Sequence, residues 1–415
     1  MQAKAGFLNR VLMPLLTALS DNIYMSAIRS GMVSVVPLTI IGGLFMVIAN
    51  LPVPGWEERI KDYLPLLNVP ITATFGLLAV FACFGIAYDL GKRFGQEAFI
   101  SASMATLVFL MIQIDMEEQV IQMDRLGSQG LFTAVLVALV SVRVQKLMTD
   151  FNMVVRMPDG VPEAVRESFL SLTPMVTLVG IFWLVRFVFG FDINERVQHA
   201  FEPLLFALST LPGILVYALL VTLLWSMGIN GDNALDAIVL PFFLQYLAAN
   251  VEAAAAGQPL PYITANGFFT TFVNVGGTGA TIGLALVLFN SRDVGLRKVS
   301  RMSLPTQVFQ INEPIFYGLP IVLNPVFMIP YVINALILTT GSYLLMDWGW
   351  IRKPFINVPW TTPPVIGHYL ATGGDWRAAV WGVASIVIAM VVYYPFARVA
   401  ERRRLEAPKA DLPMP

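Results

Sequence analysis

The chain is poor in charge, cysteine and histidine, and each shortage excludes a class of protein. Only 13% of its 415 residues are charged, against about 25% in ordinary soluble domains, while 57% are hydrophobic. The 26 basic and 27 acidic residues leave a net charge of -1, which excludes nucleic acid as a principal partner because no basic excess is present to hold a phosphate backbone. A single cysteine, Cys83, excludes a disulfide framework and a CxxC metal site, and two histidines leave little for a zinc or haem centre. We therefore expect no metal and no cofactor.

Apolar runs long enough to cross a hydrocarbon core, about 20 residues each, recur along the chain. They predict an all-α polytopic membrane protein with about ten transmembrane helices, embedded in a lipid bilayer. Asp236–Val251 is either a further span or part of a re-entrant hairpin. The clear candidates are Ile28–Leu51, Pro70–Leu90, Ala98–Ile114, Gly130–Leu147, Phe169–Phe191, Leu211–Met227, Gly279–Asn290, Pro320–Leu345 and Arg377–Phe396.

Two segments are predicted to be interfacial amphipathic helices. Residues 1–27 have apolar residues at helical spacing but no cleavage site of A-x-A type, so a signal peptide is disfavoured. Phe201–Leu208 repeats the pattern inside a connecting segment, 192–210, for which a short extramembrane turn is the alternative. The tail, residues 399–415, is predicted to be disordered from Glu401 onward.

Lysine and arginine gather in alternate loops, which sets the orientation of a polytopic protein. This pattern places both termini in the cytoplasm and requires an even number of crossings. The basic groups are Lys92 and Arg93; Arg143, Lys146, Arg156 and Arg166; Arg292, Arg297, Lys298 and Arg301; and Arg398 with Arg402, Arg403 and Arg404.

The second half of the chain interrupts its apolar runs with polar and small residues. The four interruptions are 228–233, 274–279, 310–314 and 360–364. Non-helical backbone is tolerated at membrane depth only where it is buried in protein or lines a watery cavity. Four breaks in one half therefore predict broken helices and re-entrant hairpins around a shared polar cavity, as in the substrate sites of transporters.

Glu313 is the most informative single residue. It lies in an apolar context from Val308 to Pro330 that holds no basic residue. An intramembrane carboxylate indicates a functional site, although a buried ion pair or a helix N-cap is the alternative. Glu313 is therefore predicted to accept hydrogen bonds from sugar hydroxyls and to serve as a general base.

Two tryptophans, Trp225 and Trp360, flank the polar interruptions. An indole face stacks on the apolar face of a pyranose, although each tryptophan taken alone is more typical of the interfacial belt. Gly277 and Thr278 lie in a glycine-rich segment that follows no predicted strand, which favours a hairpin tip over a phosphate-cradling loop. The other binding candidates are neutral donors and acceptors, which suit a ligand with many hydroxyls: Asn230, Asn233, Asn312, Thr361 and Thr362.

Residues 312–325, which read NEPIFYGLPIVLNP, resemble the motif of the membrane enzyme IIC components of the bacterial sugar phosphotransferase system, in the lactose, cellobiose and diacetylchitobiose family. The resemblance spans nearly the whole chain. Several further motifs stand in the family's order: Met157–Pro162, Gly276–Thr281, Val358–Pro363 and Tyr394–Phe396.

This resemblance implies a homodimer in the bacterial inner membrane, with ten spans per protomer. The first half, 28–191 with about five spans, would make the dimer contact, and the second half, 211–398, would hold the disaccharide. Glu313 corresponds to the carboxylate near the hydroxyl that is phosphorylated, and the phosphate comes from a phosphocysteine on enzyme IIB. Enzymes IIB and IIA are expected as separate chains, because Cys83 lies in a span and no soluble segment is long enough. Whether this chain is itself an enzyme is left open.

Two residues depart from the family's pattern. Asn230 stands where the family commonly has the histidine of Gly-Ile-His-Gly, and an amide cannot take a proton at neutral pH. Gln310 stands where the family has the first asparagine of Phe-Asn-Ile-Asn-Glu-Pro. Asn230 and Glu313 are the two catalytic candidates.

Three functions are compatible with these residues. The first is a IIC permease that moves a disaccharide inward by alternating access and presents it to IIB. The second is a proton-coupled or facilitated secondary transporter on the same scaffold, which Asn230 favours. The third is a membrane sensor that binds sugar without transporting it.

Overall fold

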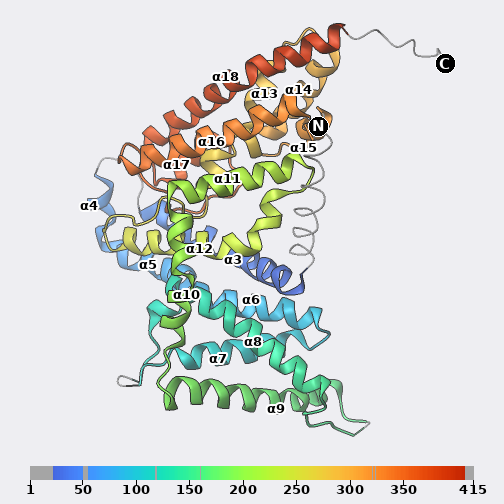
Figure 1. The fold of residues 1–415 in the computed structure, drawn as a ribbon. Helices are drawn as coiled ribbons and strands as arrows, with labels where there is room; N and C mark the ends of the chain where they lie inside the picture. The colour runs from blue at the N-terminus through green and yellow to red at the C-terminus, as the bar shows by residue number, and fades with distance from the viewer. Residues whose placement is uncertain are drawn as a thin grey trace, which may run out of the picture. The chain divides into compact units, whose positions relative to one another are not determined.

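The computed structural model describes residues 22–49, 55–116, 119–158, 160–319, 321–322 and 324–406. Helices make up most of this part of the chain, and no strand occurs in it, since the single bridge between Ile114 and Ile121 is isolated (Figure 1). The helix expected over residues 1–27 lies almost entirely outside the described residues. The all-α prediction is confirmed.

Seven described helices are long and apolar enough to cross a membrane, and the number rises to nine if each of two bent pairs forms one span. A further apolar helix, α7, has 15 residues. The segment around Asp236–Val251 lies within the 25-residue helix α12, so the structure favours a span there rather than a hairpin. The described part of the chain is thus polytopic, as predicted.

The chain divides into two compact units, which are described separately. Unit 1 contains 60–206, 233–259 and the segment that ends at Ala49, and unit 2 contains 207–232, 260–415 and the short segment 50–59. The helices α10 (Ile193–Ser209) and α12 (Gly231–Ala255) each pass from one unit to the other. The roles predicted for the two halves, dimerisation and sugar binding, stay predictions.

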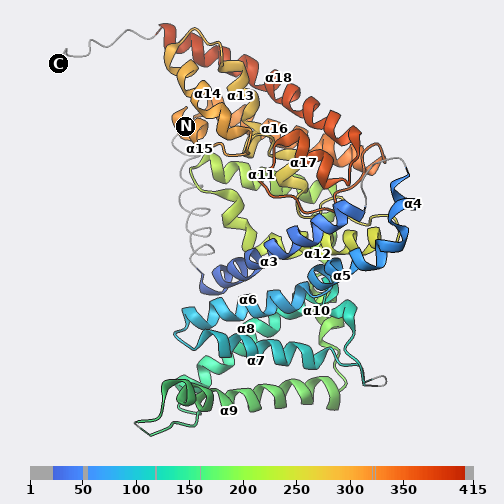
Figure 2. The same cartoon turned by 180° about the vertical axis from the view of Figure 1, so that it is seen from behind.

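Unit 1 is a stack of antiparallel and crossing helices. Figures 1 and 2 show α6 with α3 on one side and α7 and α8 on the other. Small residues allow the close approach of α3 and α6, because a Cβ at Gly31 would lie 2.4 Å from the Ile86 side chain. The helices and short helical turns of unit 1 are α3 Ile23–Ala49, η2 Lys61–Tyr63, α5 Leu64–Phe75, α6 Leu78–Arg93, α7 Ala98–Ile112, η3 Met123–Arg125, η4 Ser128–Gly130, α8 Leu131–Asp150, α9 Glu163–Trp183, η5 Leu184–Val188, most of α10, and α12 from Asn233.

In unit 2, shorter helices pack against one long helix, α18. Its contacts are with α13, α16 and α17, and a Cβ at Gly283 of α13 would lie 2.6 Å from Ala389 of α18. The helices are α4 Trp56–Ile60, which reaches the boundary of the unit, α11 Leu211–Ser226, η6 Phe268–Val273, η7 Thr278–Ala280, α13 Ile282–Leu288, α14 Val294–Gln307, α15 Glu313–Gly318, α16 Pro325–Asp347, α17 Pro364–Ala371 and α18 Trp376–Glu406.

The segment Gly279–Asn290, expected as a span, is not one continuous helix. α13 has seven residues, and it is bent by 46° from the preceding helical segment, Phe268–Ala280. Gly276, Gly277 and Gly279 all have positive φ, a conformation that cannot continue a right-handed helix. This segment is therefore a broken span or a re-entrant loop.

The end of α18 corrects the expectation of disorder from Glu401. The helix continues to Glu406 because the Glu401 carboxylate is buried and has several partners. It accepts hydrogen bonds from Ser291 Oγ at 2.7 Å and from the Arg292 amide, and it pairs with Arg398 at 2.7 Å.

Candidate functional site

The four polar interruptions predicted from the sequence all coincide with helix ends in the structure. The first separates α11 from α12, the second η6 from η7, and the third α14 from α15. The fourth immediately precedes α17. The prediction of broken helices in the second half of the chain is therefore confirmed.

Residues 276–281 form a glycine loop whose backbone other side chains approach closely. Gly277 has φ of 103°, and a Cβ at this position would lie 2.4 Å from the Asn312 Cβ. At Gly279, a Cβ would lie 2.3 Å from the Tyr331 ring. Glycine is required at these positions because a Cβ would clash with a neighbouring side chain and because φ is positive. Both features agree with the hairpin-tip interpretation.

Side chains distant in sequence hold the glycine loop in place. Gln310 Oε1 accepts hydrogen bonds from the Gly276 amide at 2.6 Å and the Gly277 amide at 3.2 Å. Asn312 Nδ2 donates to the Thr278 carbonyl at 2.9 Å, and the Tyr393 hydroxyl donates to the Gly279 carbonyl at 2.7 Å. Gln310, one of the two departures from the family's pattern, thus has a structural function in this chain.

A carboxylate that the sequence analysis did not single out joins two of the predicted site residues. Asp232 Oδ2 accepts hydrogen bonds from Trp225 Nε1 at 2.8 Å and from Thr278 Oγ1 at 3.2 Å. Asp232 lies in the first turn of α12, a candidate span. The rule that identified Glu313, an acidic residue at membrane depth, would also have identified Asp232.

Glu313 begins α15, and its side chain is exposed. Within the described part of the chain its carboxylate makes no ion pair and no hydrogen bond, and the residue that precedes the helix is Asn312. Both alternatives weighed for Glu313, a buried ion pair and a helix N-cap, therefore lose support. The carboxylate is available to a ligand.

Aromatic contacts connect α15 to α11 and α16. The Phe316 ring lies 5.3 Å from the Trp225 ring and 5.8 Å from the Tyr331 ring, measured between centroids. Unit 2 thus brings Trp225, Thr278 with Gly277, and Asn312 with Glu313 into one cluster.

The remaining predicted site residues are not shown to join this cluster. Trp360 is 59% exposed, and Thr362 lies beside Gly367 of α17. Asn230 is partly buried between α11 and α12, and Asn233 is exposed in the part of α12 that belongs to unit 1. Thr361 is partly buried next to Trp360.

Neither histidine takes the place of the one expected at position 230. His368 is fully buried in α17, where its ring contacts Phe272 at 4.6 Å and its Nδ1 faces the Pro364 carbonyl. His199 is exposed on α10 and pairs with Glu202 at 3.2 Å.

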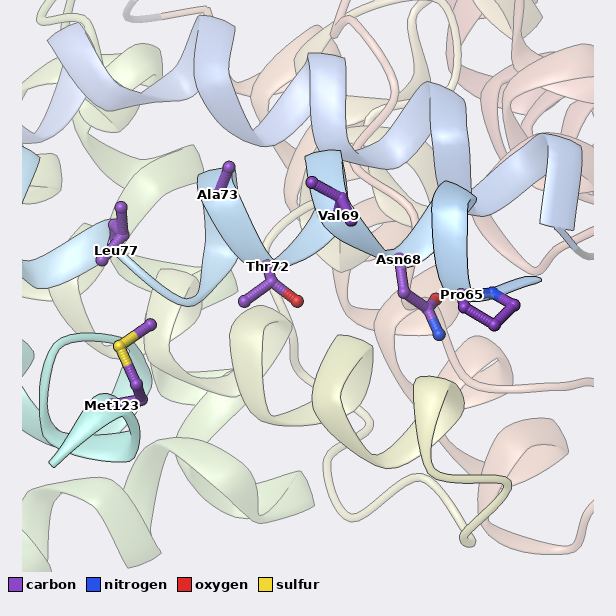
Figure 3. A pocket seen from close by; sticks show the side chains of 7 residues that line it. All are labelled: Pro65, Asn68, Val69, Thr72, Ala73, Leu77 and Met123. Carbon is purple, nitrogen blue, oxygen red and sulfur yellow. The ribbon is translucent and has the colours of Figure 1, made fainter. Parts of the chain in front are cut away.

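A pocket of about 390 Å³ lies in unit 1 and contains none of the predicted site residues. Figure 3 shows side chains of α5 along one side and Met123 with Leu77 at one end. No charged group lines it, and the residues are Pro65, Asn68, Val69, Thr72, Ala73, Leu77 and Met123.

Several apolar spans, together with helices broken around a polar cluster and a carboxylate without a partner in the described part of the chain, define a membrane transport protein. Residues 29–335 match the family described as phosphotransferase system, EIIC. The chain belongs to this family and is a sugar permease component of the phosphotransferase system.

Similar proteins cover almost the whole chain. It is 34% identical to the lichenan permease IIC component of Bacillus subtilis (strain 168), over 96% of this chain and 94% of that protein. It is 32% identical to the cellobiose-specific EIIC component of Geobacillus stearothermophilus, with the same two coverages. It is 29% identical to the lactose-specific EIICB component of Staphylococcus aureus (strain N315), over 95% of this chain and 71% of that protein.

A solved structure has the same fold. It is the crystal structure of the transporter ChbC, the IIC component from the N,N'-diacetylchitobiose-specific phosphotransferase system. The TM-score is 0.92 and the sequence identity 32%, with 98% of this chain and 100% of that chain covered.

Proposed function

We propose that the protein binds a disaccharide such as cellobiose, diacetylchitobiose or lactose beside Glu313 and presents it to enzyme IIB for phosphorylation. The observation that carries the proposal is the exposed carboxylate of Glu313, which has no partner among the described residues and adjoins a cluster of polar side chains. Relatives named for lichenan, cellobiose and lactose support the substrate class.

In this proposal the two catalytic candidates, Glu313 and Asn230, have different roles. Glu313 accepts a hydrogen bond from the reacting hydroxyl and takes its proton slowly, without a histidine to assist it, as the phosphoryl group arrives from IIB. Asn230 only holds the hydroxyl in place, because its amide cannot accept a proton. Enzymes IIB and IIA act as separate chains, and the EIICB name of the lactose relative supports IIB as a partner.

The sugar reaches the cytoplasm by alternating access, with the protein acting as a homodimer whose termini are cytoplasmic. The two compact units support a displacement of rigid bodies. The alternation of lysine- and arginine-rich loops supports the orientation.

Asn230 favours a second candidate function, proton-coupled or facilitated sugar uptake without phosphorylation. Uptake of radiolabelled cellobiose by membrane vesicles, with phosphorylated IIB and its soluble partners added, separates the two. We expect phosphoenolpyruvate to drive uptake and sugar phosphate to appear inside. Uptake that needs only a proton gradient would favour the second function, and binding without uptake would favour a sugar sensor.

The two tryptophans are expected to differ in their effect on sugar affinity and on stability. Trp225 is 6% exposed and donates its indole hydrogen to Asp232, so Trp225→Ala should lower both the melting temperature and the affinity. Trp360 is 59% exposed, so Trp360→Ala should weaken disaccharide binding more than monosaccharide binding while the melting temperature stays near that of wild type. Titration calorimetry and thermal unfolding in detergent measure both. An unchanged ratio of the two affinities in Trp360→Ala would end the stacking proposal for that residue.

A further inference from the structure

The Asp232 carboxylate accepts hydrogen bonds from two neighbouring side chains. It lies in the first turn of α12, where the helix N-terminus favours negative charge. Its Oδ2 atom accepts from the Trp225 indole at 2.8 Å and from the Thr278 hydroxyl at 3.2 Å. An indole N–H can only donate, so Oδ2 is an acceptor oxygen, and it accepts from the Thr278 hydroxyl as well.

The consequence for Thr278 is a defined hydrogen-bond polarity. A threonine hydroxyl has one proton, and here that proton is donated to Asp232. Toward any ligand the hydroxyl therefore presents only lone pairs. Glu313 also only accepts when ionised, so these two groups of the cluster together favour a ligand rich in hydrogen-bond donors.

The glycine loop that carries Thr278 has little freedom to adjust. Its carbonyl at Thr278 is held by Asn312, and its amides at Gly276 and Gly277 are held by Gln310. Through two side-chain hydrogen bonds, Asp232 connects this loop to Trp225 near the end of α11. Removing the Asp232 side chain would disconnect Trp225 from Thr278, while the hydrogen bonds from Asn312 and Gln310 would still hold the glycine loop.

We propose that Asp232 is a positioning residue of the sugar site, which holds Trp225 and Thr278 in place and makes Thr278 an acceptor for a sugar hydroxyl. This rests on the proposed function. The same arrangement disfavours the product, because a phosphate group presents no donors at neutral pH and meets two carboxylates, Asp232 and Glu313. Asp232 therefore favours binding of the free sugar over the phosphorylated sugar.

The test compares Asp232→Ala, Asp232→Asn, Thr278→Val and the double variant Asp232→Ala/Thr278→Val, with cellobiose and phosphorylated cellobiose as probes. Loss of a hydrogen bond to a charged group should weaken cellobiose binding by about tenfold in Asp232→Ala. The double variant should bind no more weakly than Asp232→Ala alone, because the two residues act through one contact. In Asp232→Asn the ratio of cellobiose affinity to phosphorylated-cellobiose affinity should fall, a change that a loss of stability alone would not produce.

Glu401→Gln is the matched control. Glu401 is a buried carboxylate of the same unit that also accepts hydrogen bonds, from Ser291, Arg292 and Arg398. The variant Glu401→Gln should lower the melting temperature and leave the ratio of cellobiose affinity to phosphorylated-cellobiose affinity unchanged. Wild-type affinity in Asp232→Ala, or additive losses in the double variant, would overturn the role of Asp232. A wild-type protein that binds no sugar would overturn the proposed function instead.

Discussion

Asn230→His is expected to raise the rate of sugar phosphate formation at saturating sugar by about 10²- to 10⁴-fold, the usual contribution of general acid–base assistance. An imidazole has an unperturbed pKa of about 6.5 and exchanges protons near neutrality, whereas an amide does not. Neither His199 nor His368 is shown to contact the cluster around Glu313, so no other histidine supplies this function. The measurement is sugar phosphate formed by membrane vesicles supplied with phosphorylated IIB.

Asn230→Gln is the control for this experiment, since it changes the size of the side chain and keeps the amide. It should give no increase in rate. Rapid turnover by wild type, with no gain from histidine, would show that Glu313 suffices as the base. Uptake without any sugar phosphate in either variant would favour the proton-coupled function.

Glu313→Gln is expected to weaken sugar binding by roughly ten- to a hundredfold while the protein stays folded. Hydrogen bonds to charged groups contribute about 1.5–3 kcal/mol, and a neutral amide replaces the strongest acceptor of the cluster. Stability should change little, because the carboxylate makes no hydrogen bond or ion pair within the described residues. Titration calorimetry with cellobiose measures the affinity, and thermal unfolding measures the stability.

Glu406→Gln provides a comparison for Glu313→Gln, because Glu406 is an exposed carboxylate of the same unit that pairs with Arg402 and with no other described residue. Its sugar affinity should equal that of wild type. Equal affinities in Glu313→Gln and wild type would remove Glu313 from the site.

The sequence predicted the fold class and the helix breaks because both depend on local composition. Runs of apolar residues are visible in any window of about 20 residues, and so are the glycines and amides that interrupt them. The continuation of α18 to Glu406 was not predictable in this way. It depends on hydrogen bonds from Ser291 and Arg292, more than a hundred residues earlier in the chain.

The candidate site was predictable as a set of residue types but not as a set of contacts. Glu313 could be found from its apolar surroundings alone. The hydrogen bonds of Asp232 with Thr278 and of Gln310 with Gly276 join segments more than thirty residues apart in sequence and require the tertiary structure. The same holds for Trp225, whose burial distinguishes it from an interfacial residue only once Phe316 and Asp232 are in place.

The close approach at Gly277 bears on how a permease of this kind moves its cargo. Asn312 lies against the glycine on one side and adjoins Glu313 on the other, and its amide is hydrogen-bonded to the loop. With no space between them, loop and carboxylate cannot slide past one another. A sugar bound beside both would then keep the same protein ligands throughout its movement, instead of being transferred from one set of residues to another.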